Sequence, residues 1–165
     1  MIEAWILYQK FKILRLLGDN MELLQLTSKQ KMFGLRGLCN EFAESINKNL
    51  DWKHWHKAVG GLVDNKIAEC WVLNDDKEYI GMLVWSYFPC LVTQELSATE
   101  ICFYTSEKAR GHGMKLLNKM IEVCKEKKVI NVNMAHFAGN ERIGTMYNRM
   151  NFVKSEISYT LRLGA

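Results

Sequence analysis

Residues 98–124 constrain the fold of this chain more than any other stretch. They begin with ATEICFYT (98–105), which is rich in β-branched and aromatic residues and predicts a strand. The loop SEKARGHG follows, and apolar residues then recur at spacings of three and four from Met114 to Cys124, which predicts an amphipathic helix. A strand that enters a helix through a glycine-containing loop is typical of α/β proteins. The length of 165 residues leaves room for one such domain around a single core.

Strand and helix patterns also alternate at the start of the chain. MELLQLTS (21–28) predicts a first strand, and Thr27 and Gln30 have the spacing of a capping box. Apolar residues at helical spacing then predict one helix that runs to about residue 47. Asp51 is a candidate cap for a second helix, whose tryptophan, valine and leucine residues predict a buried stripe.

A hairpin and a further series of strands and helices follow. IAECWVLND ends in the turn signal Asp75-Asp76, and YIGMLVWSYFPCLV returns as the second strand of a hairpin. VINVNMAHF (129–137) predicts another strand, and Asn140 caps a short helix. FVKSEISYTLRL (152–163) predicts a final strand or strand pair. The order β-α-α-β-β-β-α-β-α-β(β) predicts one mixed α/β domain.

The first 20 residues differ in character from the domain that follows. Their apolar run is interrupted by Glu3, Lys10 and Arg15 before it reaches the ~20 residues that a membrane span needs. Their charges also come after the apolar residues rather than before them, unlike the charges of a signal peptide. We therefore expect residues 1–20 to be an N-terminal extension, residues 21–165 to be the domain, and no membrane partner.

The charge of the chain favours an anionic small molecule over nucleic acid. The formal net charge is +4 and the pI is near 8.8, which is mildly basic. This excess suits an anionic cofactor but is too weak to indicate a nucleic-acid partner. The basic run KEKK (125–128) is typical of a solvated helix end.

The cysteines and histidines do not predict a metal site. The five cysteines are scattered and contain no C-x-x-C pair, which indicates free thiols in a reducing, cytoplasmic compartment. His54 and His56 are two residues apart, so on a helix their side chains point about 200° apart and cannot share one metal ion. We expect no metal.

The loop SEKARGHGMKLL (106–117) has the features of an anion site. Its glycines let backbone amides approach a ligand without an intervening side chain. The helix that follows adds unpaired N–H donors and a partial positive charge at its N-terminus. The loop lacks the full G-x-G-x-x-G of a dinucleotide fold and the G-K-S/T of a P-loop, so the sequence excludes both of those motifs.

In its wider context the stretch EICFYTSEKARGHGMKLLNKM, followed by VINVNMAHFAGNERIGTMYNRMNF, resembles the GNAT superfamily of acyl-CoA-dependent N-acetyltransferases. The shared features are a strand, a Q/R-x-x-G-x-G/A loop, a helix, a strand, and a helix with a tyrosine shortly before GF. The resemblance is strongest over residues 98–153, where Asn151 replaces the family's glycine. It implies an α/β fold with a mixed, mostly antiparallel central sheet flanked by helices, whose splayed central strands hold CoA.

The loop matches the family pattern in two registers, and both stay open. KARGHG puts Lys108 in the first position, where the family has glutamine or arginine, with Gly111 and Gly113 in place. RGHGMK puts Arg110 first and Gly113 fourth, but Lys115 then stands where glycine or alanine is usual. The resemblance therefore implies a backbone role for the loop more strongly than a role for any one of its side chains.

The resemblance also implies acetyl-CoA as co-substrate and a set of residues that bind it. The strand that precedes the loop would pair its backbone with the pantetheine arm, and the loop amides would hold the pyrophosphate. Asn140 would lie near the thiol end. The implied cofactor-binding residues are Phe103, Tyr104, Thr105, Lys108, Arg110, Gly111, His112, Gly113, Met114 and Asn140.

The implied reaction is direct attack of a neutral primary amine on the thioester, without a covalent enzyme intermediate. Tyr147 matches the tyrosine that often protonates the departing thiolate in this family. Glu100 is the leading candidate for the base because it lies on the strand that enters the loop. Glu95, His136 and a water relay are the alternatives.

A second class of function stays open. Lys115 departs from the family pattern in one register, so a degenerate acyltransferase fold that binds CoA or a protein without catalysis is the alternative. The acceptor amine could belong to a small molecule, an antibiotic, a lysine side chain or a protein N-terminus. The sequence leaves open whether the protein is a homodimer.

Overall fold

The computed structural model describes residues 21–137, 139–161 and 163. The predicted extension over residues 1–20 therefore lies outside the described residues. Contacts within the chain group into two compact units, divided between Met134 and Ala135, and each unit is considered by itself.

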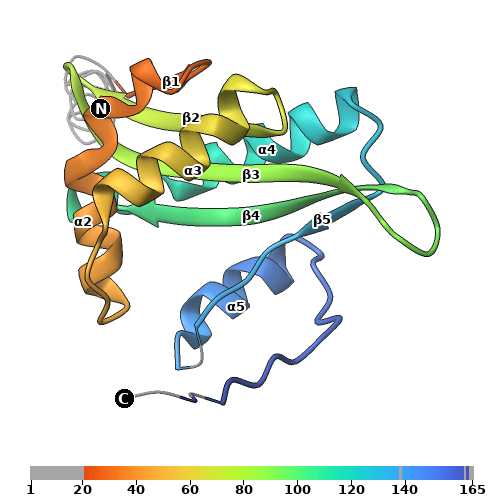
Figure 1. Cartoon of the computed structure of the whole chain (residues 1–165). Helices are drawn as coiled ribbons and strands as arrows, with labels where there is room; N and C mark the ends of the chain where they lie inside the picture. The colour runs from red at the N-terminus through yellow and green to blue at the C-terminus, as the bar shows by residue number, and fades with distance from the viewer. Residues whose placement is uncertain (1–20, 138, 162, 164–165) are drawn as a thin grey trace, which may run out of the picture. The chain divides into compact units, whose positions relative to one another are not determined.

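One five-stranded sheet organises the first unit, in the order β1-β2-β3-β4-β5 (Figure 1). The first four strands pair antiparallel with their neighbours, and β5 pairs parallel with β4. This confirms the mixed, mostly antiparallel sheet that the sequence predicts. The strands are β1 (Glu22–Gln25), β2 (Ala68–Asp75), β3 (Glu78–Pro89), β4 (Leu96–Thr105) and β5 (Asn131–Asn133).

The predicted hairpin between β2 and β3 is confirmed, and its turn is tight. Asp76 and Lys77 both have positive φ, 44° and 76°, as a two-residue turn matched to the twist of the strands requires. Asp75 pairs with Glu78 across this turn. Glu78 therefore stands at the tip of the hairpin.

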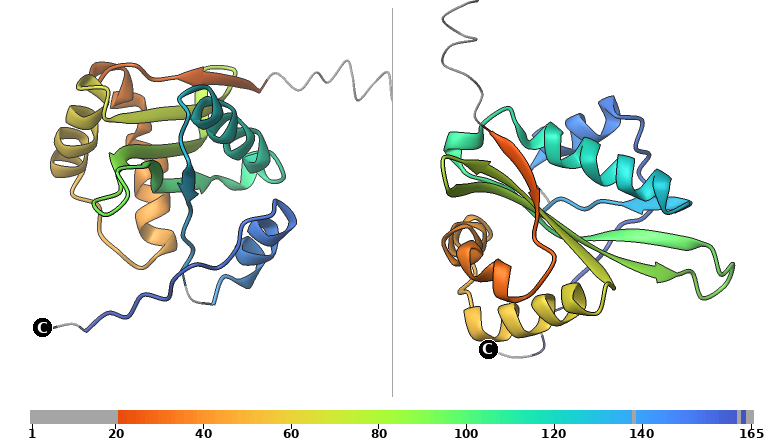
Figure 2. Two further views of the ribbon diagram at one scale, coloured as in Figure 1. Left: turned by 90° about the vertical axis from the view of Figure 1, so that its right-hand side faces the viewer. Right: turned by 90° about the horizontal axis from the view of Figure 1, so that it is seen from above.

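Helices cover both faces of the sheet in the first unit. In the view from above, η1, α2 and α3 lie on one face and α4 lies on the other (Figure 2). The single helix predicted up to about residue 47 is a 3₁₀ segment followed by an α-helix. The bounds in this unit are η1 (Gln30–Leu35), α2 (Arg36–Ser45), α3 (Trp52–Asp64), η2 (Glu107–Ala109) and α4 (Gly113–Glu126).

The caps predicted for the first two helices have different outcomes. Asp51 caps α3 as expected, because its Oδ1 accepts the backbone N–H of His54 at 2.9 Å. The capping box of Thr27 and Gln30 is wrong. The residue before η1 is Lys29, which has helical dihedrals and makes no side-chain cap, and its own N–H instead donates to Asp64 Oδ1 at 2.8 Å.

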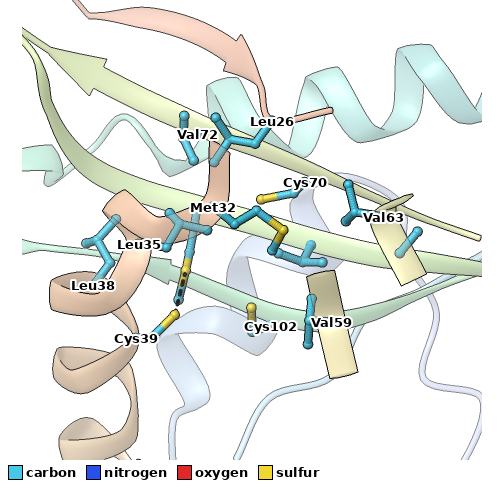
Figure 3. Packing of buried hydrophobic residues seen from close by; sticks show 13 residues of the cluster. Leu26, Met32, Leu35, Leu38, Cys39, Val59, Val63, Cys70, Val72 and Cys102 are labelled. Atoms are coloured by element: carbon cyan, nitrogen blue, oxygen red, sulfur yellow. Dashed lines mark hydrogen bonds between the residues drawn. The ribbon is translucent and has the colours of Figure 1, made fainter. Parts of the chain in front are cut away.

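The main core lies between the sheet and the η1–α2–α3 layer (Figure 3). Met32 and Leu35 of η1 are fully buried against Val72 and Met82 of the sheet. Full burial of one such side chain stabilises the fold by about 2 kcal/mol. The opposite face is closed by α4, whose fully buried residues are Leu116, Leu117 and Met120.

The second unit contains α5 (Glu141–Arg149), which Asn140 precedes at the N-cap position without a side-chain cap. The strand predicted over residues 129–137 is confirmed only for the three residues of β5. The final strand or strand pair predicted over residues 152–163 is wrong for the described residues, which form no strand there. An alternating apolar pattern forms a strand only when a partner strand accepts its hydrogen bonds, and no backbone hydrogen bond joins residues 153–161 to another described residue.

Candidate functional site

The strand β4 changes its pairing halfway along its length. β5 pairs with it only over Ser97–Thr99, and β4 continues for six more residues to Thr105. On its other side, Trp85 pairs with Glu100 but Val84 pairs with Cys102, so Ile101 is an extra residue that forms a β-bulge. A bulge increases the local twist and interrupts the ladder, which suits a strand that must leave one edge for a ligand.

The predicted pantetheine-binding residues alternate across β4. Phe103 and Thr105 face the start of α4, where a Cβ built on Gly113 would lie 3.3 Å and 3.4 Å from their side chains. Tyr104 faces the other way, and its hydroxyl donates to Glu41 Oε2 at 3.3 Å. Burial, followed by the Glu41 carboxylate, raises the pKa of Tyr104. The side chains are thus engaged on both faces of the strand.

The glycine loop is held by its own backbone. Ser106 donates its N–H to Ile80 O at 2.9 Å, and Ala109, which is fully buried, donates to Ser106 O at 3.0 Å. Gly111 has φ of +87°, a conformation that glycine adopts without strain. The loop enters α4 directly after this turn.

The start of α4 leaves backbone donors unused. Among residues 21–137, the N–H groups of Gly111, Gly113 and Met114 donate to no acceptor, and the side chain of His112 at the N-cap position does not cap the helix. The Ser106 hydroxyl is also buried without a partner in the described part of the chain. Unused amides at a helix N-terminus are a binding site for an anion, and the loop therefore fits a pyrophosphate.

Lys108 and Arg110 of the loop are exposed, and each contacts a carboxylate. Lys108 Nζ lies 2.6 Å from Glu78 Oε2, and Arg110 Nη1 lies 3.7 Å from Glu107 Oε2. Glu78 is a further residue of this region that the sequence motifs did not indicate. The register of the β2–β3 hairpin could have indicated it, because that register places Glu78 at the hairpin tip.

The two carboxylates that are candidates for the base lie in different elements, Glu100 on β4 and Glu95 in the loop before it. Glu100 is half-buried and sits beside the bulge, opposite Trp85. Glu95 is exposed at the end of the β3–β4 loop, where its Oε2 accepts the Thr93 hydroxyl at 3.1 Å. Five residues of extended chain span about 17 Å, so only one of these two carboxylates can act at the bulge.

The second unit holds the other predicted residues. Tyr147 is buried, and its hydroxyl donates to Ala135 O at 3.3 Å. Its ring lies 6.3 Å from that of His136, which is exposed and shares a hydrogen bond of 3.1 Å between Nδ1 and Phe137 O. Asn140 is exposed at the start of α5. Within this unit, His136 and Asn140 belong to the loop before α5, and the ring of Tyr147 on α5 lies near that of His136.

The described residues show neither a metal-ligand cluster nor a helix that could cross a bilayer. No group of three or more histidine, cysteine or carboxylate residues among them could bind a metal ion. In the same described part, every helix is too short or too polar to span a membrane.

Comparison with known proteins identifies what this geometry resembles. A family model described as the acetyltransferase (GNAT) family matches residues 30–152, which is more than half of the chain. No curated protein sequence matches the chain. The family match includes β4, the glycine loop, α4 and α5.

Solved structures share the fold at low sequence identity. A ribosomal-protein-alanine N-acetyltransferase from Brucella melitensis biovar Abortus 2308 superposes with a TM-score of 0.69 at 16% identity, covering 87% of this chain and 99% of that one. An aminoglycoside acetyltransferase from an uncultured soil metagenomic sample has a TM-score of 0.71 at 14% identity, over 90% and 99% of the two chains. A transcriptional regulator from Bacillus halodurans C-125 has a TM-score of 0.72 at 19% identity, over 87% and 99%.

Proposed function

The chain belongs to the acetyltransferase (GNAT) family, and from this premise we propose that it transfers an acetyl group from acetyl-CoA to a primary amine. The observation that carries the proposal is the glycine loop. Its unused amides at Gly111, Gly113 and Met114 follow directly after the bulged strand β4. Such donors bind a pyrophosphate, and the adjacent strand edge suits an extended pantetheine arm.

The proposed reaction needs three proton or charge events. The amine attacks the thioester carbonyl only as the neutral base, so an ammonium acceptor must first lose a proton. A C–N bond then forms while the carbonyl oxygen becomes an oxyanion, which a backbone N–H donor stabilises. In the last event the C–S bond breaks, the thiolate leaves with a proton, and the nitrogen, which is cationic after the attack, loses a proton so that a neutral amide remains.

We assign these roles to residues as follows. Glu100 is the proposed base, directly or through water, because it is half-buried beside the bulge. Tyr147 is the proposed proton donor to the thiolate. The residue is buried, and its hydroxyl donates a long hydrogen bond of 3.3 Å to Ala135 O, which the hydroxyl would exchange for the thiolate when it transfers the proton.

Four of the five cysteines are poor candidates for a covalent enzyme intermediate, and the exception is Cys90, whose pKa is lowered by hydrogen bonding to Thr93. Burial raises the pKa of Cys39 to about 12 and that of Cys124 to about 11, and it raises the pKa values of Cys70 and Cys102 as well. A thiol that stays protonated at neutral pH is a poor nucleophile. All five cysteines are unpaired thiols, which supports a reducing, cytoplasmic location.

The acceptor is proposed only as a primary amine. The structural neighbours include an enzyme named for a ribosomal-protein alanine and enzymes named for aminoglycosides. These names refer to different kinds of acceptor molecule for enzymes that share one fold. The fold therefore supports the class of reaction, and the acceptor must be identified by experiment.

The test is binding followed by turnover. Acetyl-CoA should raise the thermal midpoint of the protein, and thiol release should follow when a panel of polyamines, aminoglycosides and peptide N-termini is added. The panel also includes an N-acetylated peptide, which offers no free amine and should release no thiol. Absence of both the thermal shift and thiol release would contradict the proposal.

A second candidate function is a CoA-binding module without catalysis. The observation that favours it is Lys115, which stands where the family has glycine or alanine in one register of the glycine loop. A thermal shift with acetyl-CoA that is never followed by thiol release would support this module.

A further inference from the structure

The ammonium group of Lys108 makes two short contacts with a single carboxylate. Its Nζ donates to Glu78 Oε2 at 2.6 Å and to Glu78 Oε1 at 2.9 Å, so one lysine binds both oxygens of one carboxylate. The hydrogen bond to Glu78 raises the pKa of Lys108. The side chains are 62% and 61% exposed, so an anion can reach either of them.

The backbone brings this carboxylate to the loop. Ser106 donates its N–H to Ile80 O, two residues from Glu78, and this bond ties the start of the glycine loop to the hairpin. The hairpin turn NDDKE contains three carboxylates, Asp75, Asp76 and Glu78, and only one lysine, Lys77. An acidic turn thus lies beside the donors that face the proposed pyrophosphate.

The pair at Arg110 is looser. Its Nη1 lies 3.7 Å from Glu107 Oε2, and no second oxygen contact accompanies it. A long, exposed ion pair between neighbours on one turn holds its partners weakly. Arg110 can therefore turn toward an anion at little cost, whereas Lys108 must first leave two short contacts.

We propose that Glu78 sets the affinity of the acyl-CoA site by competing with the pyrophosphate for Lys108, an inference that rests on the proposed function. A purely structural role for the Lys108–Glu78 pair would contribute little to the stability of the fold. An exposed lysine–glutamate pair stabilises a fold only slightly, and the loop is already anchored by buried Ala109 and by backbone hydrogen bonds. A ligand with several phosphate charges, however, offers the Lys108 ammonium group a second anionic partner, so the two partners compete for one cation.

The experiment measures the Kd of acetyl-CoA by calorimetry for the wild type, Glu78→Gln, Lys108→Met and the double variant. Glu78→Gln should tighten binding about fivefold at low salt, and the gain should shrink as salt screens the charges. Lys108→Met should weaken binding about twofold in the wild type and about tenfold in the Glu78→Gln background, because Lys108 is free only there. The double variant should then bind as Lys108→Met does.

Glu122 provides a matched control on the same unit. Its carboxylate is 56% exposed and pairs with Lys119 at 2.8 Å, and it lies nine residues beyond Gly113, or about 13 Å along α4. Glu122→Gln removes the same charge and should change the Kd less than about twofold. Thermal unfolding of each variant checks that the fold is retained.

Two results would overturn the inference while leaving the proposed function intact. One is a Glu78→Gln variant that binds acetyl-CoA no more tightly than the wild type. The other is a gain that persists undiminished in the Lys108→Met background, which would mean that Glu78 acts without Lys108. A wild type that binds no acetyl-CoA would overturn both proposals.

Discussion

Two helices of the same unit, α3 and α4, begin in opposite ways. At α3, Asp51 accepts the N–H of His54 at 2.9 Å and closes the helix start with a side chain. At α4, His112 makes no side-chain cap, and the N–H groups of Gly113 and Met114 find no acceptor among residues 21–137. A capped start supports the fold, whereas an open start costs stability unless a ligand supplies the acceptor.

The other ends of the two helices are alike. Lys66 follows α3 with φ of 59°, and Lys128 follows α4 with φ of 57°. In both places the next N–H reaches back to a carbonyl five residues earlier, from Ile67 to Leu62 and from Val129 to Cys124, each at 2.9 Å. Both helices therefore end in a Schellman motif. The two helices therefore differ at their N-termini and not at their C-termini. This difference indicates that the N-terminus of α4 is a binding site.

Filling the open start should have the largest effect. A Cβ at Gly113 would lie 3.3 Å from the Phe103 ring, and the branches of valine would press further into β4 and displace the loop amides. Gly113→Val should therefore raise the Kd of acetyl-CoA at least about 50-fold, or about 2.3 kcal/mol. Calorimetry measures this change directly.

Gly61 on α3 is the matched control, because a Cβ there meets nothing within 4 Å. Gly61→Val should leave the Kd within about twofold of the wild type. Circular dichroism would confirm that both variants fold. Equal affinities for Gly113→Val and Gly61→Val would show that the open start of α4 is not the acyl-CoA site.

The next effect separates binding from chemistry. Tyr147→Phe removes the proposed proton donor, so it should lower kcat about tenfold while the Kd of acetyl-CoA changes less than about twofold. Loss of the bond to Ala135 O should also lower the free energy of unfolding by about 1 kcal/mol. A kcat that equals the wild-type value would assign Tyr147 a structural role.

Local patterns predicted the difference between the two helix starts. The aspartate before the α3 stripe and the glycines before the α4 stripe both act within a few residues, where sequence spacing reports geometry directly. The same holds for the β2–β3 hairpin, whose turn depends on the residues around Asp76. The placement of the glycine loop between β4 and α4 could therefore be predicted in full.

Features that depend on a distant partner could not be predicted in this way. Thr27 has the right spacing for a cap, but Lys29 adopts helical dihedrals and Asp64, 35 residues away, supplies the acceptor. Glu78 reaches Lys108 only because β3 and β4 pair in one register. The alternating tail over residues 152–163 has strand propensity, but propensity does not supply the hydrogen-bond partner that a strand requires.

Opening the closed start of α3 should have a smaller effect than either change above. Asp51→Ala leaves the His54 N–H without its acceptor and should lower the free energy of unfolding by about 1 kcal/mol. Asp51→Asn keeps a capping oxygen and should lose only a few tenths of that. Urea denaturation measures both. If Asp51→Ala also bound acetyl-CoA more weakly, the start of α3 would contribute to binding as well as to stability, which would contradict the contrast with α4.

The smallest expected effect tests whether the helix ends are as alike as their geometry indicates. A lysine at positive φ bears a strain that glycine does not, so Lys66→Gly and Lys128→Gly should each stabilise the protein by about 0.5 kcal/mol. Lys125→Gly, within α4, is the opposite control and should destabilise it by about 1 kcal/mol. Because the two end motifs share the same hydrogen bonds, their gains should agree within the error of urea denaturation. If Lys66→Gly raised the free energy of unfolding and Lys128→Gly lowered it, the end of α4 would differ in structure from the end of α3. The open start of α4 would then not be the one difference between the two helices that this comparison uses.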